Sequence, residues 1–162
     1  MFNFFKKKKE NTVVEVAEKE SDILRKDNIR LGLSPVGKFE AIEMAGRLLV
    51  EAGYVEEGYV EAMKERENVV STYIGMGVAI PHGIGEAKKN IKKSGIVVLQ
   101  FPDGVEFDDE KAYLVVGIAG IGDEHISILS NIATVLEDEE VTKELYTTGD
   151  KDKIYKLFAS TL

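Results

Sequence analysis

Apolar residues recur along the chain with two different periods, and the alternation of these periods predicts the fold class. Across 38–52 they recur every three or four residues, the spacing of a helix with one buried face, and Gly53 follows as its stop. Across 112–119 the chain is continuously apolar, which is typical of a central strand covered on both faces. Helical and extended segments alternate irregularly. We therefore predict an α/β fold with a single mixed β-sheet of about five strands, flanked by helices on both faces.

Further segments complete this prediction. Strands are expected at about 29–31, 78–80, 96–101, 105–107 and 112–119, and helices at about 38–52, 57–67, 124–136, 139–147 and 151–160. The tripeptide Pro102-Asp103-Gly104 is predicted to be a turn between two strands. Asp123 is the expected N-cap of the helix at 124–136. The apolar stripe predicted for that helix is Ile126, Leu129, Ile132, Ala133 and Leu136.

The first 27 residues differ from the rest, so we predict an N-terminal extension at 1–27, mobile or weakly helical, and a domain at 28–162. The extension has three Phe and four consecutive Lys within its first nine residues, followed by a charged run without Gly or Pro. One interpretation is a solvated tail, the usual behaviour of chain ends. The other is a weak membrane-surface contact through residues 1–9, since Phe beside Lys can bind anionic lipid.

Charge and composition exclude several classes of function. The chain has 29 acidic and 21 basic side chains and a formal net charge of −8, so no nucleic-acid partner is expected. It has no Cys, which excludes disulfides and Cys nucleophiles. No segment has the roughly 18 consecutive apolar residues of a membrane span. The start is apolar and then basic, the reverse of a secretory signal, so a cytoplasmic location is predicted.

The familiar motifs of cofactor and metal chemistry are missing. The sequence has no Gly-rich phosphate loop ending in Gly-Lys-Ser/Thr, no Gly-x-Gly-x-x-Gly, no His-Glu-x-x-His and no Gly-x-Ser-x-Gly. Nucleotide hydrolysis, zinc chemistry and ordinary serine hydrolysis are therefore not favoured. We expect neither a metal site nor a cofactor.

His82 is the first candidate functional residue among only two histidines. It stands in Pro81-His82-Gly83, directly after the apolar run at 78–80. Because Pro cannot donate to a sheet ladder and Gly lets the backbone turn, we expect a strand end with the imidazole exposed at its rim. Imidazole is a nucleophile near neutral pH and can accept a phosphoryl group on nitrogen. The alternative is a surface-turn histidine with no role.

His125 and Arg66 are the other candidates. His125 lies in the first turn of the helix at 124–136, where free backbone N–H groups and the helix dipole favour an anion and a neutral imidazole. It could equally be an ordinary polar residue at a helix start. Arg66 lies at the end of the helix at 57–67, where a solvated cation that complements the dipole is the default. It gains a role only if the fold brings it to His82.

Several short segments follow one another in a characteristic order. They are Tyr54-Val55, Tyr59-Val60-Glu61-Ala62-Met63, Arg66-Glu67, Ser71-Thr72-Tyr73-Ile74-Gly75 and Val78-Ala79-Ile80-Pro81-His82-Gly83. This series resembles the mannitol/fructose-type enzyme IIA domain of the bacterial phosphoenolpyruvate-dependent sugar phosphotransferase system. Gly117-Ile118-Ala119 and Glu124-His125-Ile126 are most similar to the mannitol branch. The resemblance covers about residues 28–162.

The resemblance implies a phosphoryl carrier. His82 would accept a phosphoryl group from phospho-HPr and pass it to a Cys of a cognate enzyme IIB, which feeds an enzyme IIC permease for a sugar alcohol, mannitol. His125 and Arg66 would stabilise the phosphoryl charge, with Thr72 and Glu86 as polar groups near His82. Two alternatives stay open, namely a regulatory enzyme IIA homologue that signals phosphorylation state and a non-catalytic protein-binding module on the same fold.

Two successive partner proteins would have to reach His82. We therefore expect an apolar patch around it, supplied by Ile74, Met76, Val78 and Ile84. The turn amides after Pro81 are expected to add hydrogen-bond donors. Since the chain has no Cys, the next phosphoryl acceptor must lie on another polypeptide.

Overall fold

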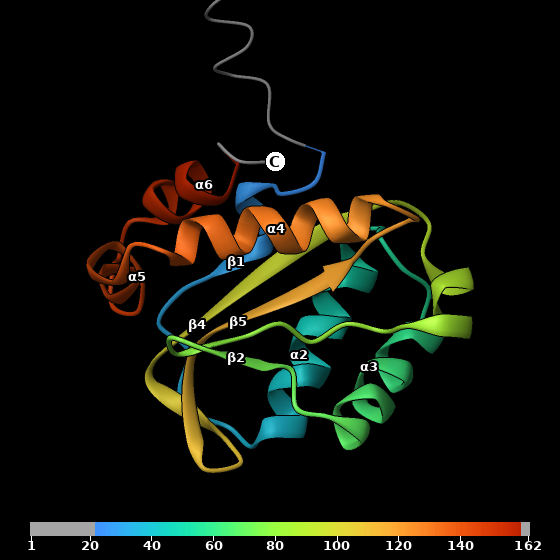
Figure 1. Ribbon diagram of the computed structural model, residues 1–162, viewed down its shortest axis with the longest axis horizontal. Helices are drawn as coiled ribbons and strands as arrows, with labels where there is room; N and C mark the ends of the chain where they lie inside the picture. The colour runs from blue at the N-terminus through green and yellow to red at the C-terminus, as the bar shows by residue number, and fades with distance from the viewer. Residues whose placement is uncertain (1–21, 160–162) are drawn as a thin grey trace, which may run out of the picture.

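The computed structural model describes residues 22–159, which form a mixed five-stranded β-sheet between two layers of helices (Figure 1). The strands are β1 (Ile29–Arg30), β2 (Tyr73–Gly75), β3 (Val78–Ala79), β4 (Gly95–Phe107) and β5 (Glu110–Ala119). The helices are α2 (Lys38–Glu51), α3 (Gly58–Val69), α4 (Glu124–Leu136), α5 (Glu139–Leu145) and α6 (Lys151–Ala159), with short 3₁₀ helices η1 (Lys26–Asn28) and η2 (Gly85–Asn90). The predicted α/β class and mixed sheet are confirmed.

The sheet has the order β1-β4-β5-β3-β2, with the long antiparallel pair β4–β5 at its centre. β1 runs parallel to β4, β3 runs parallel to β5, and β2 closes the other edge antiparallel to β3. Side chains of β5 alternate between the two faces, so Val115 packs in the core beneath α2 and Val116 in the core beneath α4. Because both faces are covered, β5 is apolar along most of its length.

Helices α2 and α3 cover one face of the sheet, and α4 and α6 cover the other (Figure 1). The buried residues of α2 follow the predicted helical spacing. The predicted stripe of α4 was partly wrong, since Ile126 and Ala133 face solvent. The residues of α4 that are buried are Ile128, Ile132, Val135 and Leu136. Helix α4 has apolar residues on more than one face, so periodicity alone does not decide which face is turned inward.

The turn predicted at Pro102-Asp103-Gly104 is a bulge inside β4 instead. Gln100 pairs with Leu114 and Val105 pairs with Ala112, so residues 101–104 of β4 stand opposite a single residue of β5. Gly104 has a φ of 81°, which accommodates the extra length. Pro and Gly give the same local signal in a turn and in a bulge. Here pairing with β5 on both sides keeps the strand continuous.

Residues 22–27 pack onto the domain. Leu24 is fully buried, and the Ile96 N–H donates to the Ile23 carbonyl at 2.8 Å. The Tyr54 hydroxyl donates to the carbonyl of Asp22 at 3.0 Å. Residues 1–21 of the predicted extension, including the proposed lipid contact at 1–9, lie outside the described residues. Within 22–159, no helix is both long and apolar enough to cross a membrane.

Candidate active site

The backbone around His82 is held against the central strand β5. The Ile118 N–H donates to the Pro81 carbonyl at 3.0 Å, and His82 itself pairs with Ile118 as an isolated parallel bridge. Only 7% of His82 is exposed, so the prediction of an exposed imidazole at a strand rim was wrong. The turn continues along the sheet after β3 ends, which places the ring among neighbours from distant parts of the chain.

Hydrogen bonding selects one nitrogen of His82 for chemistry. Nδ1 lies 2.6 Å from the Ile80 carbonyl oxygen. A carbonyl only accepts, so Nδ1 carries the hydrogen, and the neutral ring keeps its lone pair on Nε2. Across residues 22–159, the one fully buried side-chain nitrogen or oxygen without a partner is Nδ1 of His125. Nε2 of His82, which makes no hydrogen bond there, therefore still reaches solvent.

The surroundings keep both imidazoles neutral. Burial lowers the pKa of His82, and the charges of Arg66 and Lys88 lower it further, against the Ile80 hydrogen bond and the Glu67 charge. Burial, His82 and Lys88 together lower the pKa of His125 to about 4. The two rings lie side by side, with centroids 5.1 Å apart and planes inclined by 56°. At neutral pH His82 is thus an uncharged nucleophile beside an uncharged second imidazole.

His125 reaches this position through a tight turn into α4. A Cβ at Gly120 would lie 2.5 Å from His125 Cα, so only glycine permits the approach. Asp123 makes no side-chain capping bond, contrary to the prediction, because its backbone is already helical. The first N–H groups of the helix donate to backbone carbonyls instead, Glu124 to Ile121 at 3.0 Å and His125 to Gly122 at 3.4 Å. The anion-binding donors predicted at this helix start are therefore partly in use.

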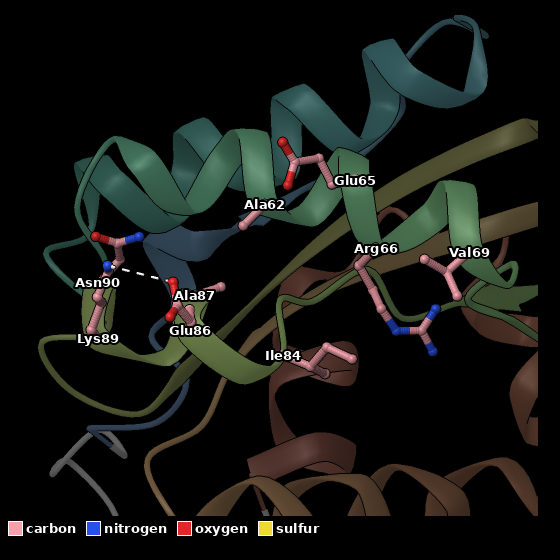
Figure 2. A pocket seen from close by; sticks show the side chains of 9 residues that line it. All are labelled: Ala62, Glu65, Arg66, Val69, Ile84, Glu86, Ala87, Lys89 and Asn90. Carbon is pink, nitrogen blue, oxygen red and sulfur yellow. Dashed lines mark ion pairs between the residues drawn. The ribbon is translucent and has the colours of Figure 1, made fainter.

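Arg66 lies near the end of α3, where its Nη1 donates to the Val70 carbonyl at 2.7 Å. Figure 2 shows the side chain extending beside Val69, at the rim of a surface hollow of about 350 Å³ that Ile84 also lines. Its charge acts on His82. The structure therefore brings Arg66 within electrostatic range of His82 while its guanidinium group caps the end of the helix.

Of the two predicted polar neighbours of His82, the structure connects Thr72 to the His82 turn but not Glu86. Thr72 is buried, and its carbonyl accepts the Ile80 N–H at 3.0 Å, one residue before the Pro81 turn. Glu86 has a 96% exposed side chain and pairs with Lys89 at 3.9 Å (Figure 2). Thr72 is therefore connected to the His82 turn through the backbone, whereas no contact joins Glu86 to His82.

Three residues of the site were not identified from the sequence: Tyr59, Glu67 and Lys88. Glu67 is buried, and its carboxylate accepts the N–H of Thr72 at 3.0 Å and the Thr72 hydroxyl. The hydroxyl of Tyr59 accepts the Gly83 N–H at 2.8 Å. This turn amide, predicted to be a free donor, is therefore occupied. A signal did exist, because Tyr59, Met63 and Glu67 are spaced four apart on the buried face of α3.

Fold and site together define a class of protein. An α/β domain displays a neutral histidine nucleophile beside a second histidine, within range of the cations Arg66 and Lys88, an arrangement suited to transferring an anionic group. No three His, Asp or Glu side chains within residues 22–159 are placed to hold a metal ion. Residues 22–161 match the family described as "Phosphoenolpyruvate-dependent sugar phosphotransferase system, EIIA 2", and the chain belongs to this family. It is a phosphotransferase component of the enzyme IIA type.

Relatives support this assignment. The mannitol-specific phosphotransferase enzyme IIA component of Staphylococcus aureus strain Mu50 is 44% identical over 138 residues, covering 85% of this chain and 96% of that protein. The mannitol-specific EIICBA component of Vibrio cholerae is 45% identical over 141 residues, but the chain spans only 22% of its length. The Escherichia coli mannitol enzyme IIA, solved in complex with phosphorylated enzyme IIB, is 42% identical with a TM-score of 0.80, covering 85% of this chain and 97% of that one.

Proposed function

We propose that this chain carries a phosphoryl group on Nε2 of His82, accepted from phospho-HPr and passed to a Cys of a cognate enzyme IIB during mannitol uptake. The hydrogen bond from His82 Nδ1 to the Ile80 carbonyl supports the proposal most directly, because it leaves the lone pair on the nitrogen that reaches solvent. The names of the S. aureus and V. cholerae relatives support mannitol as the cargo.

The transfer consists of two displacements at phosphorus. In the first, the Nε2 lone pair of His82 forms an N–P bond as the N–P bond of the donor breaks, and the electron pair of that bond stays on the donor nitrogen. The His82 ring gains positive charge, which the Ile80 carbonyl stabilises through Nδ1–H. In the second, a thiolate of enzyme IIB forms an S–P bond and the electron pair returns to Nε2. Such transfer depends mainly on positioning and charge stabilisation.

Three neighbours of His82 stabilise the negative charge of the phosphoryl group. Arg66 can exchange its bond to the exposed Val70 carbonyl for phosphoryl oxygens, since water can satisfy that carbonyl. Lys88 adds a second positive charge within electrostatic range of both histidines. His125 Nδ1, buried without a partner, gains one when it donates a hydrogen bond to the phosphoryl group.

The surface around the site suits docking by other proteins. Ile84 is 53% exposed, and it lines the hollow beside Arg66 together with Val69. Ile74 and Ile126 are also exposed large apolar side chains. Of the predicted patch, Val78 is fully buried and does not contribute. Exposed apolar residues close to a reactive group are typical of protein interaction surfaces.

The experiment is phosphorylation with purified components. The full chain is incubated with phosphoenolpyruvate, enzyme I and HPr, and we expect one acid-labile, base-stable phosphate that His82→Gln does not acquire. A wild-type chain that stays unlabelled would reject the carrier function. A labelled His82→Gln variant would reject the site.

A second stage tests the partner and the cargo. The labelled chain is mixed with mannitol-type and fructose-type enzyme IIB, and transfer to the mannitol type should be faster by at least about tenfold. Transfer to neither protein would favour a regulatory enzyme IIA homologue. The matched control is a mannitol-type enzyme IIB whose phosphoryl-accepting Cys is replaced by Ser.

A further inference from the structure

Tyr59 connects the His82 turn to the central strand. The residue lies in α3 and is fully buried. Its hydroxyl donates to the Ile118 carbonyl at 2.7 Å and accepts the Gly83 N–H at 2.8 Å. Gly83 follows His82 in the chain, and Ile118 is the residue of β5 with which His82 pairs. One hydroxyl therefore bonds both to the residue that follows the nucleophile and to the residue of β5 that pairs with it.

This hydroxyl occupies a defined place in the sheet ladder. In a parallel pairing of His82 with Ile118, the Ile118 N–H donates to the Pro81 carbonyl, as it does here at 3.0 Å. The next ladder bond would run from the Gly83 N–H to the Ile118 carbonyl. The Tyr59 hydroxyl stands between these two groups and bonds to both. A side chain of α3 thus completes the ladder where the turn leaves the sheet.

We propose that Tyr59 is a positioning residue for phosphoryl transfer, which fixes the Pro81-His82-Gly83 turn so that Nε2 of His82 is aimed at the incoming phosphorus. The proposal rests on the function proposed above. Tyr59 acts through the turn and does not touch the phosphoryl group. Its hydroxyl and the Ile80 carbonyl act together, since Ile80 orients the ring and Tyr59 holds the backbone that carries it.

The packing of the Tyr59 ring and the bonding of its hydroxyl can be separated. The ring lies against the turn, because a Cβ at Gly83 would be 2.9 Å from Tyr59 Cε1. Burial raises the pKa of Tyr59 to about 12, so the hydroxyl remains a donor throughout the working pH range. Tyr59→Phe keeps the ring and removes both hydrogen bonds. The Gly83 N–H and the Ile118 carbonyl then lose their common partner.

The chain contains a matched control in Tyr54. This tyrosine is also fully buried, and its hydroxyl also bridges two polar groups, accepting from Asn28 Nδ2 at 3.1 Å and donating to the Asp22 carbonyl at 3.0 Å. Those partners belong to the segment that precedes β1, not to the His82 turn. Tyr54→Phe therefore removes a buried bridging hydroxyl of the same kind without affecting the turn.

The test compares single-turnover phosphoryl transfer from phospho-HPr to the wild type, Tyr59→Phe and Tyr54→Phe. At saturating donor we expect Tyr59→Phe to react about 10- to 100-fold more slowly, with the donor concentration for half-maximal rate unchanged within about twofold. Tyr54→Phe should stay within about twofold of the wild-type rate, even if its melting temperature falls as far as that of Tyr59→Phe. Equal rates in the two variants would overturn the positioning role.

A second readout separates this inference from the proposed function. In nitrogen-15 NMR spectra, Tyr59→Phe should shift the His82 ring signals and speed hydrogen exchange of the Gly83 amide at least about tenfold, while Tyr54→Phe leaves both unchanged. If the wild-type chain accepts no phosphate, the carrier function fails, and these spectra alone decide whether Tyr59 fixes the His82 turn. Unchanged His82 and Gly83 signals in Tyr59→Phe would reject it.

Discussion

The two histidines of the site lie 5.1 Å apart, but the segments that hold them are built differently. His82 stands in a turn whose backbone and ring are fixed by bonds to Ile80, Tyr59 and Ile118. His125 lies in the first turn of a helix that lacks a side-chain cap, and its buried Nδ1 has no partner. The nucleophile is therefore oriented before the reaction, whereas the second histidine retains a hydrogen-bonding group for the arriving charge.

Because one histidine is held in place and the other has an unpartnered nitrogen, we expect them to contribute differently to phosphoryl transfer. Orientation matters most when the N–P bond forms on His82. A donor that gains its partner only when the phosphoryl group is present stabilises the charged state and its transition states. The following experiments change one or the other of these segments and measure the effect on phosphoryl transfer or on stability.

The largest effect is expected from His125→Ala. Removing a donor that meets developing charge typically slows catalysis by about 100- to 1000-fold. We expect that loss in onward transfer to enzyme IIB, and a loss of less than about tenfold in labelling by phospho-HPr, since His125 is not the nucleophile. Both rates can be followed by rapid quench. Complete loss of labelling, with the fold intact by circular dichroism, would contradict the separation of roles.

Alanine substitutions at glycines should show which segment is more tightly constrained. At Gly120, a Cβ would meet the backbone of His125 at 2.5 Å, so we expect Gly120→Ala to lower the free energy of unfolding by about 2–3 kcal/mol. At Gly83, the nearest atoms belong to side chains at 2.9 and 3.0 Å, and a loss of about 1 kcal/mol is expected.

The control for these variants is Gly149→Ala. Nothing lies within 4 Å of a Cβ at this position, so urea unfolding of the variant should match the wild type. A Gly120→Ala variant as stable as Gly149→Ala would show that the start of α4 can shift freely. The tight contact with His125 would then have no structural consequence.

The smallest effect is a dependence of stability on pH. His125 has a pKa of about 4 in the folded chain against 6.5 as a free side chain. Between these values the unfolded chain binds a proton that the folded chain does not, so the free energy of unfolding falls as pH falls from about 6.5 to about 4. Solvent screening of this half-buried group reduces the size of the effect.

Urea unfolding at pH 7 and pH 4.5 measures this dependence. His125→Gln should lose less stability between the two pH values than the wild type does. His82, whose pKa is also lowered by burial, adds in the same direction, so the His82→Gln variant is the matched comparison. Identical pH profiles for His125→Gln and the wild type would contradict the lowered pKa of His125.

The sequence predicted the helices and central strands well, because their apolar periods are set by the faces they bury. It did not predict the burial of His82, because the residues around it come from α3 and α4, far away along the chain. The bulge at Pro102-Asp103-Gly104 was misread because local Pro and Gly signals do not show that pairing with β5 resumes beyond it. In both places the local structure depends on contacts with residues that are distant in the sequence.

The candidate site could be predicted only in part, for a similar reason. His82, His125 and Arg66 stand in recognisable motifs, and the structure places both His125 and Arg66 within electrostatic range of His82. Glu67 and Tyr59 look like ordinary helix positions until the buried face of α3 is known. Glu86 falls in the motif region but lies on the outward side of η2, which spacing along the sequence does not show.

The order of the strands in the sheet also has a consequence for synthesis. β1 pairs with β4 through Ile29 and Val98, so this N-terminal strand has no partner until almost seventy later residues have been made. The β4–β5 hairpin, by contrast, closes locally. We expect a nascent chain that ends near residue 90 to remain susceptible to protease within 22–35, and one that ends near residue 140 to be protected there. On the ribosome, the first strand of this domain is therefore among the last to find its place.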